Sequence, residues 1–410
     1  MSSQVFLVPG FLGFSKLGSQ GYFTDVAGPL EEAGFTVTPL DTISTGSIAA
    51  RARHLADELV RTLEPGVEHL HFVGHSTGGL DVRLLLGATR QVLRDHRFAD
   101  GSTVADARAA SQAHTLLTAL DRTRAAVGLA TPHRGTPLAD LALAAGLGLV
   151  SQRTVRVITH PLVRPLTGLA LRSVQASVRR LAPLTVEGSF TRWISGSLLD
   201  GEPHEILLWL SEVGLDTGAL LGLTTTSMTS LHPALQDRPG VRYASACTAA
   251  PRPTGGLGPP GVVWANTAVY RALWQVTGHD PAPLAPYAPG DLAALRARWT
   301  RDAAAGHDVG DVELPEPGTV ATLPNDGIVP TYSQVHGEVV AVVASDHLDC
   351  VGFYPHCQGT GGDWPRCEGR PSLSGWVRSG ADYRDSRHAF LWSRLAACFT
   401  AAEQGEPFPV

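Results

Sequence analysis

The chain has 410 residues, of which 43% are hydrophobic and 17% charged, and its formal net charge is −6 at pH 7. This is an ordinary globular composition, large enough for one big domain with insertions. No part reads as a basic stripe, which argues against a nucleic-acid partner, and no stretch reaches about 18 uninterrupted apolar residues, so we expect no membrane span. The opening residues MSSQVFLVPG lack a basic and then apolar leader, which predicts a cytoplasmic chain or a mature chain whose signal has been removed.

Strands and helices alternate in the first part of the chain. Short apolar runs predict strands at 5–8 and 35–40, with a helical stretch between them. Apolar positions at helical spacing predict a longer helix from Ile48, with Ser47 as its N-cap. Strands that alternate with helices imply a parallel, doubly wound sheet that is covered on both faces.

The next predicted strand ends in a glycine-rich turn within the sequence LHFVGHSTGGLDVR at 70–83. Gly74, Ser76 and Gly78 satisfy the pattern G-x-S-x-G, which is typical of a tight strand-to-helix turn. The glycines remove side chains that would collide, and the turn lifts the serine hydroxyl over the sheet. The alternative is a glycine-rich turn with an incidental serine.

After this turn the sequence predicts a surface excursion to about residue 124 and then a buried strand at 125–130. Residues 141–240 hold leucine-rich, helix-like segments, which we interpret as a helical cap or lid inserted into the core. The sheet resumes at 241–246. Three regions follow: a Pro/Gly-rich insertion at about 251–318, a strand at 338–345 and a closing helix at about 386–402. The predicted domains are therefore the N-terminal part of the core at 1–140, the cap at 141–240 and the C-terminal part of the core at 241–410.

A serine hydroxyl becomes a useful nucleophile only beside a base that is itself oriented by a carboxylate. In folds of this type the partners follow in the order Ser, Asp or Glu, His. Asp326 lies in an Asn-Asp-Gly turn, and His347 comes shortly after the strong apolar strand predicted at 338–345. Ser76, Asp326 and His347 stand in the required order, so the sequence predicts a catalytic triad.

Each partner has an alternative interpretation. Asn-Asp-Gly is a favoured turn, so Asp326 could be purely structural. Asp346 is a rival for the orienting acid, but adjacent residues of an extended chain point to opposite sides. The rivals for the base, none of which directly follows such a strand, are His336, His356 and His388.

The chemistry also needs two backbone N–H groups to stabilise the negative charge of the tetrahedral intermediate. One donor is expected from Thr77, which follows the nucleophile. The second is expected from Phe11, in the loop VPGFLG, where Gly10 and Gly13 let the backbone approach the substrate. The alternative for this loop is a simple strand-to-helix turn.

The five cysteines fall into two groups. Cys247 and Cys398 lie in apolar segments and are expected to be buried thiols. The other three lie in a glycine-rich loop, where one disulfide is feasible, with Cys357–Cys367 favoured over pairs that involve Cys350. Zinc with His356 beside Cys357 is the rival interpretation, although the usual C-x₂-C spacing is absent.

The motifs together resemble the bacterial triacylglycerol lipases of the Pseudomonas and Burkholderia type, which have the α/β-hydrolase fold. The resemblance is carried by VFLVPGFLGF, VGHSTGGLDVR, ATPHRGTPLAD, NDGIVPTYS and DHLD. It implies the triad and the two oxyanion donors already named. It also implies, more loosely, that Arg51 holds the oxyanion loop, the alternative being a solvated arginine on a helix.

Four features depart from the family pattern. The family usually has His-Gly in the first loop, where this chain has Pro9-Gly10. The family holds a structural calcium ion near the catalytic histidine, and Asp349 matches one ligand, whereas Phe353 stands where the family has a glutamine. The family is usually secreted, and the cysteine-bearing loop lies outside its pattern.

The sequence thus predicts a serine hydrolase of carboxylic esters that needs no cofactor, with structural calcium at Asp349 as the one metal expectation. Its apolar cap predicts a lipase that acts on medium-chain or long-chain acylglycerols at a lipid–water interface. The alternatives are an esterase, or a hydrolase of polyesters or other acyl groups, because the fold and the triad do not specify the acyl group. A catalytically dead binding protein is disfavoured, since no triad residue is missing.

Overall fold

The computed structural model describes most of the two core parts of the chain. The described ranges are 2–10, 16–17, 20–43, 46–146, 221–231, 235–253, 270–271, 273–278, 289–314, 323–354 and 379–409. The greater part of the predicted cap at 141–240 lies outside them, as do Phe11, His356, Cys357 and Cys367.

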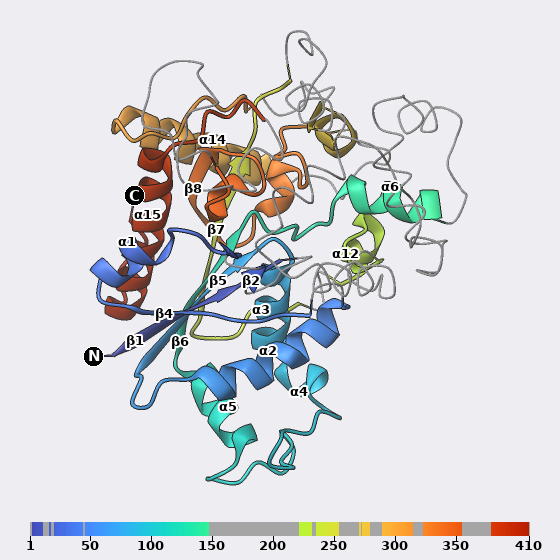
Figure 1. The fold of residues 1–410 in the computed structure, drawn as a ribbon, viewed down its shortest axis with the longest axis vertical. Coiled ribbons are helices and arrows are strands. Elements are labelled where there is room, and N and C mark those ends of the chain that lie inside the picture. The colour runs from blue at the N-terminus through green and yellow to red at the C-terminus, as the bar shows by residue number, and fades with distance from the viewer. Residues whose placement is uncertain are drawn as a thin grey trace.

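A six-stranded sheet forms the centre of the described structure (Figure 1). Its strands lie in the order β4-β1-β5-β6-β7-β8, and every neighbouring pair is parallel. The bounds are Ser3–Val8 for β1, Thr36–Pro39 for β4, His69–His75 for β5, Thr123–Leu129 for β6, Arg242–Ala249 for β7 and Glu338–Ala344 for β8. A separate antiparallel pair joins β2 (Lys16–Leu17) to β3 (Gln20–Gly21). The six strands that the sequence predicts are confirmed.

Helices fill most of the connections between these strands. Their bounds are Ala27–Glu32 for α1, Ile48–Thr62 for α2, Thr77–Gly87 for α3, Thr89–Val92 for α4, Gln112–Asp121 for α5, Pro137–Gly146 for α6, Thr225–Leu231 for α12, Pro289–Ala304 for α14 and Asp385–Gln404 for α15. Short 3₁₀-helices cover Thr331–Gln334 and Asp349–Val351. The predicted N-cap of α2 is confirmed, because the Ser47 hydroxyl accepts from the Ala50 N–H at 3.2 Å.

Alternate side chains of each strand face opposite layers of helices. On β1, Val5 and Leu7 belong to the hydrophobic cluster that includes side chains of α1 and α15. Phe6 and Val8 belong to the cluster that includes side chains of α2, α3 and α5. Figure 1 shows these two groups of helices on the two sides of the sheet. All four side chains are fully buried, as expected for a parallel strand that is covered on both faces.

Two helices lie where the sequence analysis expected irregular chain. α5 falls within the stretch interpreted as a surface excursion, yet its Leu116 and Leu120 are fully buried. α14 falls within the expected Pro/Gly-rich insertion and packs on β8. Its buried face carries Arg298 and Asp302 beside leucines, so the apolar spacing that announces a helix is interrupted.

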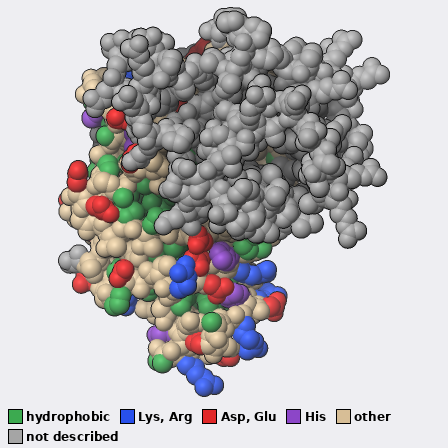
Figure 2. Space-filling view, viewed as in Figure 1, with side chains coloured by type: hydrophobic (Ala, Val, Ile, Leu, Met, Phe, Trp, Pro, Cys, Tyr) green, Lys and Arg blue, Asp and Glu red, His purple; other side chains and the backbone are tan. Residues whose placement is uncertain are grey.

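The surface of the described residues shows no field of one sign on the face drawn in Figure 2, where acidic and basic side chains are interspersed. No helix within the described ranges has the length and apolar character needed to cross a membrane. Cys247 and Cys398 are buried free thiols, which confirms that expectation, and Cys350 is a buried free thiol as well.

The all-parallel sheet covered by helices on both faces, with a sharp strand-to-helix turn after β5, defines the α/β-hydrolase fold. The predicted fold class is confirmed. The carboxyl ends of β5, β7 and β8 lie at the same edge of the sheet, where sites form in such folds.

Candidate active site

Ser76 occupies a strained turn between β5 and α3. Its φ and ψ are 54° and −129°, and φ is positive in few non-glycine residues. A Cβ atom at Gly74 would lie 2.4 Å from the Gly79 Cα, and one at Gly78 would lie 2.2 Å from the Val8 carbonyl oxygen. The flanking glycines are therefore required by contact as well as by the turn.

His347 and Asp326 meet although they come from separate loops. His347 lies just beyond β8, and its Nδ1 is 2.8 Å from Oδ2 of Asp326. The backbone N–H of His347 also donates to the Asp326 carbonyl at 3.1 Å. The two side chains are 8% and 0% exposed, so this hydrogen-bonded pair lies almost wholly out of water.

The Asp326 carboxylate is fixed by further donors on both oxygens. Oδ2 accepts from the Thr248 hydroxyl at 2.8 Å and from the Gln334 amide at 3.2 Å. Oδ1 accepts from the backbone N–H groups of Ile328 and Val329 at 2.9 and 2.7 Å. The motifs in the sequence did not indicate Thr248 or Gln334. Thr248 lies within β7, where no motif marks it. Gln334 lies just beyond the block NDGIVPTYS, and this proximity was the one signal that could have indicated it.

Asp346 has a different set of partners. Its Oδ1 accepts from the N–H groups of Leu348 and Asp349, both at 3.0 Å. Burial raises the pKa of Asp346 to about 6. The carboxyl group thus caps the short 3₁₀-helix after His347, while Asp326 is the residue that bonds the imidazole.

Gly10 lies directly against Ser76. A Cβ atom at Gly10 would be 2.5 Å from the Ser76 Cβ and 3.0 Å from the His75 carbonyl oxygen. Thr77 is the first residue of α3, where backbone N–H groups have no partner within the helix. Phe11 lies outside the described residues, but its N–H shares a peptide group with the Gly10 carbonyl.

Arg51 donates hydrogen bonds to the carbonyl groups of this loop. Its Nη2 donates to the carbonyls of Pro9 and Gly10 at 2.8 and 3.2 Å, and Nη1 donates to that of Ile43. Its Nε donates to Oδ2 of Asp81 at 2.8 Å. Arg51 is fully buried, so the alternative of a solvated helix arginine is wrong.

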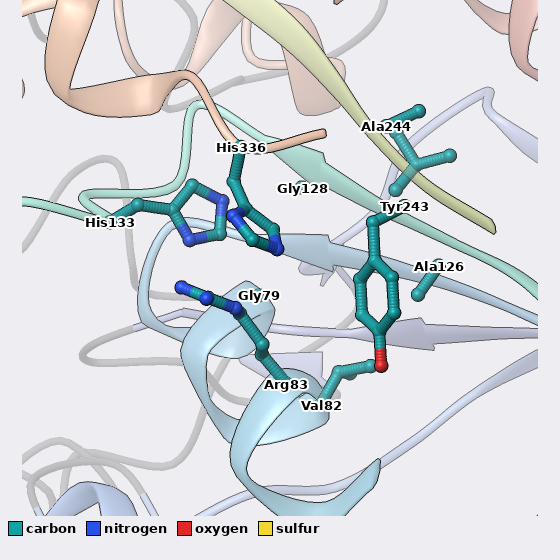
Figure 3. Close-up of a pocket in the computed structure, with 10 residues that line it drawn as sticks. Gly79, Val82, Arg83, Ala126, Gly128, His133, Tyr243, Ala244 and His336 are labelled. Atoms are coloured by element: carbon teal, nitrogen blue, oxygen red, sulfur yellow. The ribbon is translucent and has the colours of Figure 1, made fainter. Parts of the chain in front are cut away.

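The rival histidines have other partners. His336 Nε2 is 2.8 Å from Oδ1 of Asp237, and its ring lies 5.0 Å from that of His133. Figure 3 shows these two rings facing the Arg83 guanidinium, in a small pocket that side chains of α3, β6 and β7 also line. The other rival in the described residues, His388, packs against the rings of Tyr354 and Trp392.

Asp349, the calcium candidate, lies beside Asp346. Its Oδ2 accepts from the Asp346 N–H at 3.4 Å. Burial, and then the neighbouring Asp346 charge, raise the pKa of Asp349 well above its usual range. Calcium takes six to eight oxygen ligands. Within the described residues, no third His, Cys, Asp or Glu joins this pair to form a metal-binding group.

No protein-family model and no curated protein matches the chain. Among solved structures, a metagenomic carboxyl esterase is 18% identical with a TM-score of 0.46, over 98% of this chain and 76% of that one. Lipase 1 from Pelosinus fermentans is 17% identical with a TM-score of 0.44, over 96% and 98% of the two chains. The Staphylococcus hyicus lipase is 16% identical with a TM-score of 0.39, over 86% and 89%. Membership of the Pseudomonas and Burkholderia type stays a prediction.

Proposed function

We propose that the chain is a serine hydrolase of carboxylic esters, with Ser76 as nucleophile, His347 as general base and Asp326 as the orienting acid. One observation carries this proposal. A serine in a strained turn at the carboxyl end of a strand lies next to a residue, His75, whose ring is 2.8 Å from the carbonyl oxygen of His347. His347 in turn is hydrogen-bonded to Asp326, a buried aspartate whose two carboxylate oxygens both accept further hydrogen bonds. No direct hydrogen bond joins Ser76 to His347, and such bonds often tighten only when substrate is bound.

The proposed reaction follows from which ring nitrogen of His347 is available to accept a proton. Asp326 holds Nδ1 of His347, so Nε2 is the atom available to take the Ser76 proton. Ser76 Oγ then attacks the ester carbonyl carbon, and the imidazolium returns the proton to the leaving alcohol. Water repeats the sequence on the acyl-enzyme, gives its proton to His347 and releases the acid as Ser76 regains its hydrogen.

The N–H groups of Thr77 and Phe11 are the proposed donors to the oxyanion. The start of α3 supports the first assignment, because the unpaired N–H groups of a helix N-terminus favour negative charge. The contacts of Arg51 with Pro9 and Gly10 support the second, because a peptide group is planar and the Gly10 carbonyl is already held.

The substrate class is proposed from the sequence. Leucine-rich segments at 141–240 support a preference for medium or long acyl chains and for a lipid–water interface. A series of p-nitrophenyl esters from acetate to palmitate, with emulsified triglyceride alongside, separates this lipase from its alternatives. Fastest turnover on acetate, with a smooth rate curve through the solubility limit, would leave a plain esterase.

The triad is tested with matched variants. Ser76→Ala is expected to abolish ester hydrolysis and labelling by a fluorophosphonate, because removal of a triad member costs several orders of magnitude in kcat. Asp326→Asn keeps the acceptor for Ile328 and Val329 but loses the charge beside His347, so a large loss is expected. Asp346→Asn also keeps an acceptor oxygen and is expected to leave most activity. Equal losses in the two Asn variants, or labelling at another serine, would overturn the assignment.

A further inference from the structure

A chain of hydrogen bonds crosses the three segments that carry the proposed site. The Gly10 N–H, in the oxyanion loop, donates to the Tyr22 hydroxyl at 3.1 Å. The Tyr22 oxygen is 2.6 Å from Nδ1 of His75, and Nε2 of His75 is 2.8 Å from the carbonyl oxygen of His347. All of these bonds are buried. The nucleophile itself is the next residue, Ser76.

The direction of each bond follows from the chemistry of the groups. A carbonyl oxygen only accepts, so Nε2 of His75 must carry a hydrogen. Burial lowers the pKa of His75 well below its usual range, so the ring is neutral and has a single N–H. Nδ1 is then a bare acceptor, and Tyr22 must donate its hydroxyl hydrogen to it. The hydroxyl oxygen remains free to accept from Gly10, so every donor in the chain meets one acceptor.

We propose that His75 and Tyr22 are positioning residues that fix the oxyanion loop, the nucleophile turn and the loop of the catalytic base relative to one another. This inference rests on the proposed function. Neither residue reacts, and each acts through the backbone of a neighbour: Tyr22 through Gly10, and His75 through His347. The neutral state of His75 matters as well, because its ring centre is 4.7 Å from that of His347, where positive charge develops during the reaction.

Loss of the Tyr22 hydroxyl breaks the chain at its centre. The Gly10 N–H loses its acceptor and Nδ1 of His75 loses its donor, while Nε2 of His75 still donates to the His347 carbonyl oxygen. The oxyanion loop is then no longer tied to the nucleophile turn and to the loop of the base. Small displacements of reacting groups have large effects on rate.

The test compares two buried tyrosines. Tyr22→Phe is expected to lower kcat on a p-nitrophenyl ester by about tenfold to hundredfold with KM within about twofold, since alignment and not substrate binding is lost. Tyr383→Phe is the matched control. Tyr383 is 5% exposed beside 6% for Tyr22, lies in the same hydrophobic cluster, and its hydroxyl has no hydrogen-bond partner among the described residues. Equal kcat values for the two variants would overturn the proposal.

A second comparison uses His75 itself. A Gln side chain offers an N–H donor and a carbonyl acceptor, as the neutral ring does, whereas Leu offers neither. His75→Gln is therefore expected to keep more of the wild-type kcat than His75→Leu, provided that circular dichroism shows both variants to be folded. The reverse order would contradict a role in hydrogen bonding.

The hydrogen-bond chain is also visible without catalysis. In protein with ¹⁵N-labelled histidine, the His75 signals, assigned by their loss in His75→Gln, are expected to show the Nε2–H tautomer unchanged between about pH 5.5 and 8. Tyr22→Phe is expected to keep the hydrogen on Nε2 and to shift the Nδ1 signal, because the hydrogen bond from the Tyr22 hydroxyl is lost. A His75 ring that titrates in this range, or carries its hydrogen on Nδ1, would overturn the inference. A wild-type chain that neither hydrolyses esters nor reacts with a fluorophosphonate would instead overturn the proposed function.

Discussion

At the scale of single residues, the buried pair of Arg51 and Asp81 joins a well-bonded arginine to an incompletely bonded carboxylate. Arg51 meets acceptors with Nε, Nη1 and Nη2, whereas Oδ1 of Asp81 is buried without a hydrogen-bond partner among the described residues. An unsolvated carboxylate oxygen makes the ionised form costly. Burial accordingly raises the pKa of Asp81 to about 7, with Arg51 opposing the shift.

This pKa predicts a pH dependence of stability. The unfolded carboxyl group has a pKa near 3.9, so between about pH 4 and 7 the folded state holds a proton that the unfolded state releases. The contribution of Asp81 to stability is therefore fully present below about pH 4 and is lost as the pH rises through about 7. Asp81→Asn has no such titration. Its free energy of unfolding, relative to wild type, is expected to rise with pH across this range, by at most about 1.4 kcal/mol per unit. Urea unfolding at four pH values measures it, and a constant difference contradicts it.

The candidate site residues that the sequence indicates are those with a local signature. Ser76 stands among glycines whose spacing the turn requires, and His347 follows a strong apolar strand. Thr248, Gln334 and Tyr22 have no such signature, because each acts on a residue that the fold alone brings near. Whether Arg51 is buried or solvated could not be decided from its helix, since both readings place it on the same element.

At the scale of elements, the loop after β1 and the turn after β5 are in contact through glycine. Gly10→Ala would place a Cβ atom 2.5 Å from that of Ser76, so the loop must move away from the nucleophile. We expect a loss of at least about a hundredfold in kcat/KM on a short ester.

Gly28→Ala is the control for this substitution. Gly28 lies in α1 and has nothing within 4 Å of an added Cβ atom. We expect unchanged activity and a change of less than about 1 kcal/mol in the free energy of unfolding, because the restriction that Pro29 places on the preceding residue opposes the higher helix propensity of alanine. Wild-type activity in Gly10→Ala would show that the oxyanion loop does not depend on this close contact.

α14 is joined to α15 by a buried charge network. Oδ1 of Asp302 lies 2.9 Å from Arg394 and 3.5 Å from Arg298, and all three residues are buried. Asp302→Ala leaves two buried arginines without their shared carboxylate, so a loss of about 3–5 kcal/mol in the free energy of unfolding is expected. Arg301→Ala, on the exposed side of the same helix, is expected to change it by less than about 0.5 kcal/mol. Chemical denaturation separates the two, and similar values would contradict the network.

Elements were predictable where apolar spacing was uninterrupted. The strands β1, β6 and β8 contain apolar runs too short for a typical helix, and in β5 apolar Leu70 and Phe72 alternate with His69 and His71. In α14 the same charge network that joins it to α15 replaces apolar residues on the buried face, and the surrounding proline and glycine suggest a loop. The long-range partner, Arg394 on α15, cannot be seen in the local sequence.

At the scale of the whole molecule, the metal content is a prediction that removal can test. Asp346 and Asp349 supply two carboxylates beside the loop of the proposed base. If calcium completes its ligands there, its role is structural. EDTA is then expected to lower the melting temperature while leaving the rate on a soluble ester unchanged at low temperature, and added calcium is expected to restore the melting temperature. An unchanged melting curve with no metal in elemental analysis contradicts this prediction.

The overall fold was predictable because alternation of strand and helix permits few arrangements. A parallel sheet needs helical connections on both faces, and the chain provides them from β1 to β6 without a break in pattern. The arrangement of 141–240 was less accessible to sequence reasoning, since consecutive apolar residues such as those at 206–210 do not define one buried face. Those residues lie outside the described ranges.

The pairing of β6 with β7 bears on how the chain is made. β6 ends at Leu129 and its neighbour begins only at Arg242, whereas β1, β4, β5 and β6 follow one another closely. During synthesis the N-terminal four strands emerge first, with one side of β6 still unpaired. An open strand edge invites pairing with other chains, and contacts distant in sequence form slowly. Ser76 is then present long before Asp326 and His347, so the nascent chain holds its proposed nucleophile without the proposed base. The three proposed triad residues are together only when the last strand and the loop beyond it have left the ribosome.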